Sequence, residues 1–188
     1  MSWTRVLQHV SADHCVFGIP TFENGENISG DLLLSGKPIS FDRLSLPVIR
    51  WGHVLPISMA MQVFPVLNEA ATAFFAKNLG EDVQLIECAP VNGHNFWIAN
   101  ILPVLDCLDR SNTRAEFYPH NYPTSHLRDR VKFAFELAIY QSKVVEHPIF
   151  RIADDPLKLI VTRTFLSALI DLGLLGLTEC DLPRYVAV

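Results

Sequence analysis

Two stretches of the chain place apolar residues at the spacing of an amphipathic helix. In residues 65–79 the apolar side chains fall on one helical face, with Pro65 suited to the first turn and Gly80 to the end. A second stretch, residues 162–172, opens with a threonine that suits an N-cap and is followed by Gly173. The sequence therefore predicts two main helices, one near the middle of the chain and one near its end.

Strand patterns surround these helices. Residues 131–139 alternate apolar with polar side chains, which is the clearest period of two in the chain. Two apolar runs, 83–89 and 95–101, are separated by Asn92-Gly93, a dipeptide that favours a tight hairpin turn, so we expect these runs to pair antiparallel. Further short strands are expected at residues 147–152, 158–161 and 174–179.

Residues 1–60 carry a weaker pattern, broken by prolines and by a polar turn near residue 25. We expect an irregular N-terminal segment of the same domain that wraps the rest, while residues 61–188 form the α+β core and the last eight residues form a tail. Within the N-terminal segment, short strands are expected at residues 15–17, 32–34 and 48–51. Strands in blocks with two confident helices predict an α+β fold, a mostly antiparallel sheet with two main helices packed on it.

Composition narrows the classes of function. Hydrophobic residues make up 49% of the 188 residues and charged residues 19%, which is enough for a sizeable core. The net charge is −5 and no run of Lys or Arg occurs, so nucleic acid is not an expected partner. No window approaches the roughly 18 apolar residues of a membrane span, and the first residues do not begin a signal peptide. We therefore expect a cytoplasmic protein with no membrane partner.

No catalytic or metal motif stands out in the chain. The four cysteines are widely separated, and Cys107 lies in an apolar run where a thiol more often packs than reacts. His94, His120, His126 and Asp129 could in principle bind a metal, but they lack the close spacing of metal ligands. Glycine-rich phosphate loops are absent. We expect no metal, no cofactor and no catalytic residue.

The polar segment between residues 112 and 130 is the main candidate for binding. Two prolines interrupt it, and long irregular segments in compact domains are often either functional or mobile. Tyrosine and arginine are enriched among the residues that dominate protein interfaces. We therefore take the following residues as candidate contacts, with an ordinary variable loop as the alternative: Tyr118, His120, Tyr122 and Arg128.

We expect structural roles for several residues in the stretch before this segment. Trp97 begins an aromatic and aliphatic run that ends in Asn100, whose side chain we expect to satisfy backbone groups near Pro103. Asp109 and Ser111 close the next apolar run, and we expect them to hold the following turn by side-chain hydrogen bonds to the backbone.

Several short motifs in the second half of the chain occur in a familiar order. An aromatic strand ending in Asn occupies residues 96–101, and an exit segment containing two aspartates and a serine occupies residues 104–111. A strand with the sequence Ile-Phe-Arg-Ile ends at residue 152, and a strand–helix unit leads to a Gly-Leu-Leu-Gly-Leu segment at residues 173–177. This order, over residues 64–180, resembles a bacterial family of immunity proteins of polymorphic toxin systems, typified by a myxobacterial protein and formerly described as a domain of unknown function.

The resemblance implies a protein that binds and neutralises a cognate toxin by protein–protein association, and it carries over no catalytic residue. Its motif positions look structural, and in this chain they are Trp97, Asn100, Asp106, Asp109, Ser111, Phe150, Gly173 and Gly176. The chain departs from the family pattern at residues 165–172, which are apolar where an acidic residue or a lysine is expected. The alternative function is a small hydrolase or transferase with an unrecognised active site, and the oligomeric state stays open.

Overall fold

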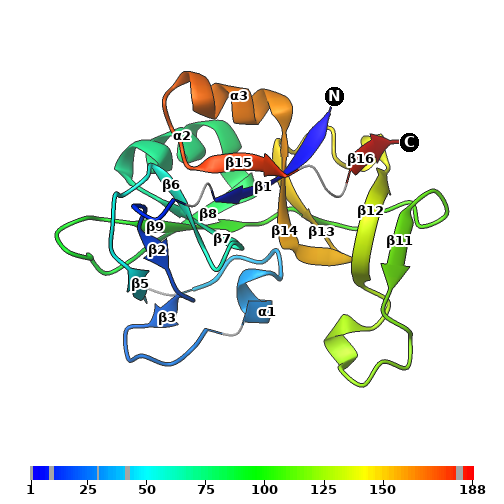
Figure 1. Cartoon of the computed structure of the whole chain (residues 1–188), viewed down its shortest axis with the longest axis horizontal. Helices are drawn as coiled ribbons and strands as arrows, with labels where there is room; N and C mark the ends of the chain where they lie inside the picture. The colour runs from blue at the N-terminus through cyan, green and yellow to red at the C-terminus, as the bar shows by residue number, and fades with distance from the viewer. Residues whose placement is uncertain (1, 9–10, 29, 41–42, 181–183) are drawn as a thin grey trace.

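Strands predominate in the computed structural model, which describes residues 2–8, 11–28, 30–40, 43–180 and 184–188 (Figure 1). The largest sheet has five strands, in the order β10 (Val104–Leu105), β13 (Ile149–Ile152), β14 (Asp155–Thr162), β1 (Trp3–Gln8) and β15 (Leu177–Cys180). A second sheet has four strands, in the order β6 (Ile57–Ala60), β7 (Phe64–Leu67), β9 (Trp97–Ile101) and β8 (Val83–Glu87).

Three smaller sheets complete the strands. One contains β11 (Arg114–Phe117), β12 (Val131–Ile139) and β16 (Arg184–Ala187), and two strand pairs join β2 (Val16–Phe17) to β5 (Val48–Arg50) and β3 (Thr21–Phe22) to β4 (Leu44–Ser45). Among the described strand pairs, only β10 with β13 and β12 with β16 are parallel. Strands therefore predominate and mostly pair antiparallel, as predicted, but they divide among several sheets instead of forming one.

The helices are α1 (Gly30–Leu33), α2 (Glu69–Leu79) and α3 (Arg163–Asp171), with short 3-10 turns η1 (Gly80–Asp82), η2 (Ser125–Leu127) and η3 (Gln141–Lys143). Helix α3 matches its prediction, because the Thr162 hydroxyl accepts a hydrogen bond from the Phe165 backbone N–H at 3.2 Å and Gly173 adopts φ 69°. Among the described residues, no helix has the length and apolar character that crossing a membrane requires.

Helix α2 starts later than predicted. Residues 65–67 belong to strand β7, and the Asn68 side chain caps the helix by accepting a hydrogen bond from the Ala71 N–H at 3.0 Å. Val66 and Leu67 are adjacent and both buried, yet they pack into different hydrophobic clusters on opposite faces of the sheet. A strand covered on both faces has a continuous apolar run, and that run extended the helical pattern in the sequence.

The predicted hairpin is confirmed. Strands β8 and β9 pair antiparallel, with Leu85 opposite Ala99, and the turn between them has positive φ at both Asn92 (49°) and Gly93 (80°). These angles are those of a type I′ turn, whose twist matches that of the flanking strands. The strand predicted at residues 131–139 is also present, as β12.

Three expectations about the chain's outer parts need correction. Residues 30–33 form helix α1 where a strand was predicted at residues 32–34. The expected C-terminal tail contains strand β16, which pairs with β12, while residues 181–183 lie outside the described part. Strand β1 was not predicted at all, and it lies inside the five-stranded sheet between β14 and β15.

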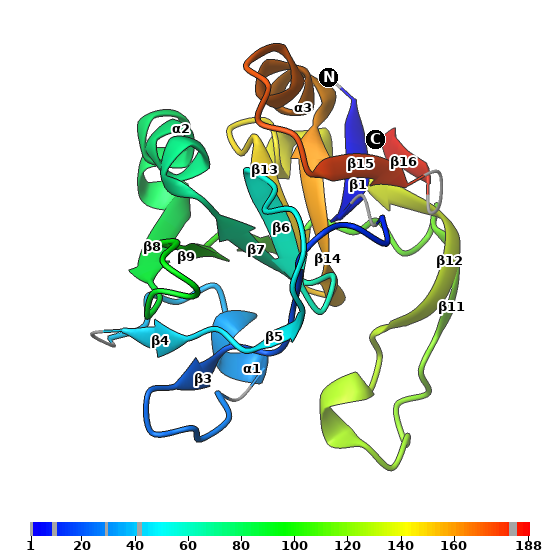
Figure 2. The same ribbon diagram turned by 60° about the vertical axis from the view of Figure 1, so that its left-hand side comes forward.

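The buried hydrophobic residues of the described part form three clusters. The first joins α2 and α3 to the two larger sheets, with the rings of Phe75 and Phe165 5.7 Å apart in an edge-to-face arrangement. The second lies between the four-stranded sheet and the N-terminal segment, around Phe17 and Phe96. The third connects the five-stranded sheet to β12 and includes Phe150. Figures 1 and 2 show α2 and α3 along one side of the molecule and the β11–β12 hairpin extending from the main body.

Candidate functional site

The candidate contact residues lie on a projecting hairpin formed by β11, β12 and the residues that connect them, 118–130. We call this hairpin the arm and residues 118–130 its tip. The two strands pair antiparallel, and two register irregularities interrupt the pairing between residues 114 and 117. In Figure 2 the arm stands apart from the rest of the chain, and the tip lies at its far end. The arm therefore presents the tip away from the core.

The backbone of the tip is folded by its own hydrogen bonds. The Tyr118 N–H donates to the Arg130 carbonyl at 2.9 Å, and the Asp129 N–H donates to the Tyr118 carbonyl at 3.1 Å. Asp129 adopts φ 61°, a left-handed conformation that aspartate tolerates better than most residues. Between these paired ends of the tip, η2 and a turn at residues 119–122 add further local hydrogen bonds.

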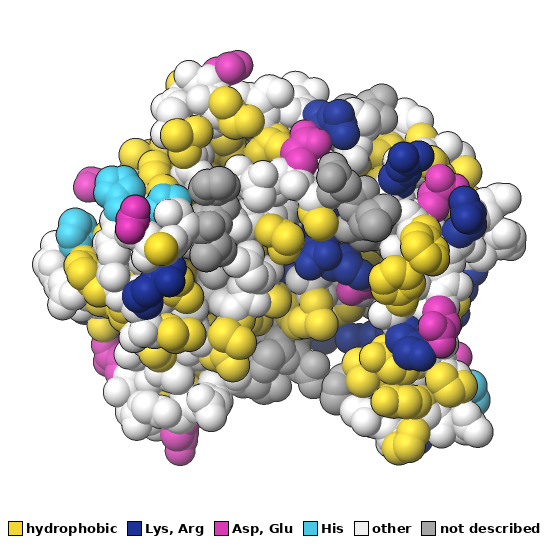
Figure 3. Space-filling view, viewed as in Figure 1, with side chains coloured by type: hydrophobic (Ala, Val, Ile, Leu, Met, Phe, Trp, Pro, Cys, Tyr) yellow, Lys and Arg dark blue, Asp and Glu magenta, His cyan; other side chains and the backbone are white. Residues whose placement is uncertain are grey.

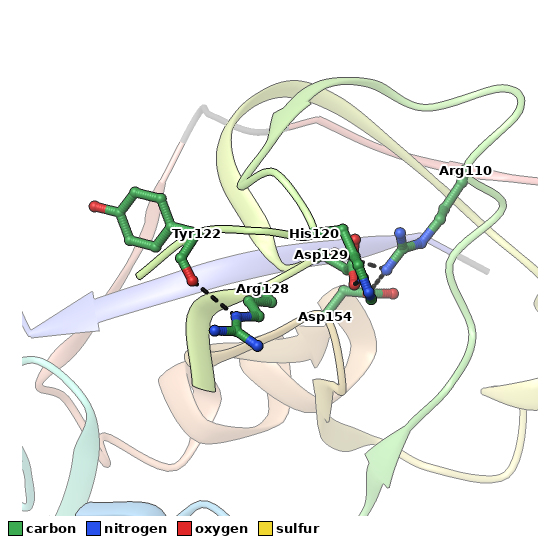
Figure 4. Close-up of polar contacts among 6 residues, drawn as sticks. All are labelled: Arg110, His120, Tyr122, Arg128, Asp129 and Asp154. Atoms are coloured by element: carbon green, nitrogen blue, oxygen red, sulfur yellow. Dashed lines mark hydrogen bonds and ion pairs between the residues drawn. The ribbon is translucent and has the colours of Figure 1, made fainter. Parts of the chain in front are cut away.

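Side-chain contacts within the tip bring the four predicted contact residues into two groups. The Arg128 Nε donates to the Tyr122 carbonyl at 2.8 Å (Figure 4). The rings of Tyr122 and Tyr118 lie 4.7 Å apart at 49°. His120 Nδ1 lies 2.8 Å from Asp129 Oδ2, and the imidazole is 91% exposed. The tip thus holds two tyrosine rings in tilted contact, a guanidinium and an imidazole.

Arg110 links the tip to the main body, a role that the sequence did not indicate. Its guanidinium donates to the Asp129 carbonyl at 2.7 Å, forms an ion pair with Asp154 and lies 4.8 Å from the centre of the Phe117 ring (Figure 4). Asp154 precedes β14, and its carbonyl accepts a hydrogen bond from the Val131 N–H at 3.0 Å. One arginine therefore connects the C-terminal end of the tip and the last residue of β11 to the turn between β13 and β14.

An exposed aromatic pair on β12 adds to the surface of the arm. Phe133 is 51% exposed and Phe135 is 54% exposed, and their rings meet edge to face at 4.8 Å. The period of two in the sequence located this strand but could not say which of its apolar residues the core would cover. Figure 3 shows hydrophobic side chains and Lys or Arg side chains together on the lobe that the tip forms at the lower right.

The predicted motif residues of the β9 region lie in the main body. Trp97 is half-buried at the start of β9. Asn100 is buried, and its Nδ2 donates to the Lys37 carbonyl and to Gln84 Oε1, both at 3.0 Å. The expected partner near Pro103 is therefore wrong, because the N-terminal segment passes over this strand and provides the carbonyl.

The exit segment leads from the body into the arm. Asp109 accepts hydrogen bonds from the backbone N–H groups of Ser111, at 2.9 Å, and Asn112, at 3.3 Å, as well as from the Asn112 side chain at 2.7 Å. These bonds lower the pKa of Asp109, the Asn112 side chain most. Asp106 is exposed, and its carbonyl accepts a hydrogen bond from Lys143 Nζ at 2.6 Å. Asp109 thus shapes the turn that begins the arm, through the kind of hydrogen bond that its sequence position predicted.

The remaining motif residues either pack in the core or allow two backbone segments to lie close together. Phe150 is fully buried in the third cluster. Gly173 and Gly176 both have positive φ in the connection from α3 to β15, and a Cβ on Gly176 would overlap the carbonyl oxygen of Ile57. These residues belong to the scaffold and lie away from the tip.

The nucleophile and metal alternatives gain no support from the geometry. Cys107 is fully buried, and its burial raises the pKa of the thiol to about 12, which leaves almost no thiolate at neutral pH. Of the metal candidates, His120 contacts Asp129, while His94 lies against Trp51 with ring centres 5.8 Å apart. The side chain of His126 lies outside the described part. Within the described part, no group of three His, Cys, Asp or Glu residues lies close enough together to hold a metal ion.

Comparison with known proteins finds a family match for this chain. The model of an immunity protein family (Imm11) matches residues 60–179, which include both larger helices and the whole arm. A search of curated proteins found no match. The match covers well over half of the chain and agrees with the resemblance over residues 64–180.

Proposed function

The chain belongs to the Imm11 immunity protein family, and on that premise we propose that it binds and neutralises a cognate toxin, with the arm as its contact surface. The toxin would be a protein of a polymorphic toxin system, and the binding would take place in the cytoplasm. Neutralisation would follow from association alone, by covering the toxin's active site or by blocking a movement that the toxin requires. We choose this surface because the projecting tip brings Tyr, His and Arg side chains together, and local contacts hold each of them in place.

The composition of the tip supports this surface. Tyrosine and arginine are the residues that most often dominate binding energy at protein interfaces, because they combine large contact area with directed hydrogen bonds. Tyr118 and Tyr122 are already in ring contact, and Arg128 is held by the Tyr122 carbonyl, so binding would immobilise few free side chains. A surface that is ordered before binding loses less conformational entropy when the complex forms.

The size of the arm also supports this surface. A stable interface covers roughly 800 Å² on each partner, which is more than a few loop residues provide. Phe133 and Phe135 extend the exposed aromatic surface from the tip along β12. An exposed aromatic pair beside polar residues is typical of a surface that another protein covers.

The experiment is co-expression of this protein with the product of the adjacent gene, with host growth and co-purification as readouts. Rescue of growth together with a stable complex supports neutralisation by binding. Alanine is then substituted singly for Tyr118, His120, Tyr122 and Arg128. We expect the tyrosine and arginine variants to weaken the complex about fivefold or more each, since interface residues that dominate binding cost over about 1 kcal/mol when truncated.

Control variants separate binding from folding. Trp51→Ala removes an exposed aromatic residue beside β5, and Lys77→Ala removes an exposed cation from α2, both outside the arm. We expect these controls to bind as the wild type does, and the tip variants to keep the wild-type melting temperature. Unchanged affinity in all four tip variants would exclude the tip from the interface, and a harmless or non-binding neighbour would remove the main support for the immunity role.

A further inference from the structure

A pocket of about 260 Å³ lies where the arm meets the five-stranded sheet. Its charged lining residues are four cations and two carboxylates, namely Arg5, Arg130, Lys132, Lys158, Asp154 and Asp155. The positive excess stands out in a chain whose net charge is −5. In Figure 3, Lys or Arg side chains lie in the hollow between the main body and the lobe of the tip.

Most of these charges are already neutralised by a neighbour. Asp154 pairs with Arg110, Asp155 pairs with Lys158, and Lys132 pairs with Glu116 at 2.6 Å. That leaves Arg5, from β1, and Arg130, from the end of the tip. Among the residues that the structure describes, neither guanidinium has an ion-pair or hydrogen-bond partner, and Arg5 Nε is buried without one.

The surroundings of Arg5 are poorly hydrated. Burial raises the pKa of Asp155, although the charges of Lys158, Arg5 and Arg130 oppose the shift. The Tyr185 hydroxyl is buried without a partner in the described structure, and its pKa is raised chiefly by burial. Buried donors without partners cost free energy, and charges interact more strongly where water is scarce. An oxyanion that entered here would find unused donors in a favourable field.

We infer that this pocket binds the carboxylate of an acidic side chain that the toxin presents to the arm. This inference rests on the proposed function and adds the chemistry of one contact. Tyr118 belongs to both the tip and the lining of the pocket, so one partner could cover both. A guanidinium binds a carboxylate through two parallel N–H donors, which makes Arg5 and Arg130 the binding residues.

The charge of the lining favours an oxyanion, and its size favours a single side chain as the occupant. The two aspartates reduce the formal excess of the lining to two positive charges, which attracts an anionic group. The pocket is also smaller than the roughly 300–1,000 Å³ of typical small-molecule sites. One side chain, anchored by a protein that contacts the arm, matches both properties.

The test begins with Arg5→Gln and Arg130→Gln, which keep hydrogen-bonding capacity and remove the charge. Arg184→Gln is the matched control, because Arg184 is exposed on β16 and strand alternation directs it to the side opposite its neighbour Tyr185. We expect each pocket variant to weaken the toxin complex about tenfold or more. Removing one member of a desolvated charge pair leaves the other charge unpaired in the interface, which lowers the affinity of the complex. We expect the control to bind as the wild type does.

A charge reversal identifies the partner group. Arg130→Glu should abolish toxin binding, and one Asp→Lys or Glu→Lys substitution in the toxin should restore binding to this variant while weakening binding to the wild type. In parallel, glutarate is added to the isolated protein, with glutaramide as the uncharged control, and backbone amide shifts are followed by NMR. We expect glutarate alone to shift Arg5, Tyr118 and Arg130, and the shifts to disappear in the two glutamine variants.

Each result has a distinct meaning. Tight toxin binding by the wild type with unchanged affinity in both glutamine variants overturns this inference and leaves the proposed function standing. Glutarate binding in the pocket together with that unchanged affinity identifies a site for a free carboxylate and also overturns the assignment to the toxin. No wild-type binding to the neighbouring gene product overturns the proposed function and the toxin carboxylate together.

Discussion

Replacing Gly176 by alanine tests whether one close backbone approach holds the connection between α3 and β15 against strand β6. Gly176 has φ 137°, and a Cβ built there would overlap the carbonyl oxygen of Ile57 and lie 2.7 Å from its carbonyl carbon. The same contact carries a hydrogen bond from the Ile57 N–H to the Leu175 carbonyl at 3.2 Å. Because the obstacle is backbone, a change of side-chain rotamer cannot relieve it.

The expected loss of stability has two parts. A side chain forced into this region of φ costs roughly 1–3 kcal/mol. Loss of the hydrogen bond as the connection moves away from Ile57 adds about 1 kcal/mol. We therefore expect Gly176→Ala to lower the free energy of unfolding by about 3 kcal/mol, which corresponds to roughly 6–12 °C in melting temperature for a chain of this length.

Gly173→Ala is the matched control, three residues earlier in the same connection. Gly173 also has positive φ, 69°, but a Cβ there meets no atom within 4 Å. Only the conformational cost applies, so we expect a loss of about 1 kcal/mol, or roughly 2–4 °C. Urea unfolding and thermal melts of both variants measure the difference. Equal losses in the two variants would refute the role of the Ile57 contact, because they differ chiefly in that contact.

Two further predictions concern buried polar groups. Cys107 should react with a thiol reagent at neutral pH only after denaturation, because burial raises its pKa to about 12; rapid labelling of this cysteine in the folded protein, located by mass spectrometry, would reopen the nucleophile hypothesis. Asn100→Ala should lower the free energy of unfolding by roughly 1–3 kcal/mol, because the Lys37 carbonyl loses its buried donor. Asn78→Ala, which removes an exposed hydrogen bond on α2, should cost much less in the same urea titration, and equal losses would contradict the reasoning.

Elements defined by neighbours in the sequence were the ones that the sequence predicted well. Helix α3 has its cap and its terminating glycine within the chain segment itself, and the turn at Asn92-Gly93 needs only two residues to adopt positive φ. The hydrogen bonds of Asp109 likewise reach no further than Asn112. Local chemistry determines such features, so they can be recognised before any tertiary contact is known.

Elements defined by distant partners were missed or misplaced. Strand β7 looked like the start of a helix because each of its faces is covered by a different cluster. Strand β16 looked like a tail because its partner, β12, lies about fifty residues earlier in the chain. Arg151 looked like an ordinary strand residue, yet it is buried and donates to the carbonyls of Pro156 at 2.7 Å and Val63 at 2.6 Å. No local pattern predicts such pairings.

The same division applies to function. The sequence by itself determined the family, through the order of short motifs, and it drew attention to residues 112–130 through their composition. Only the tertiary structure decided that residues 118–130 form the folded tip of a projecting arm, that Phe133 and Phe135 stay exposed beside it, and that Arg5 and Arg130 line one pocket. Composition and motif order are properties of the chain, whereas exposure and the meeting of distant charges depend on how the strands pair and what they leave uncovered.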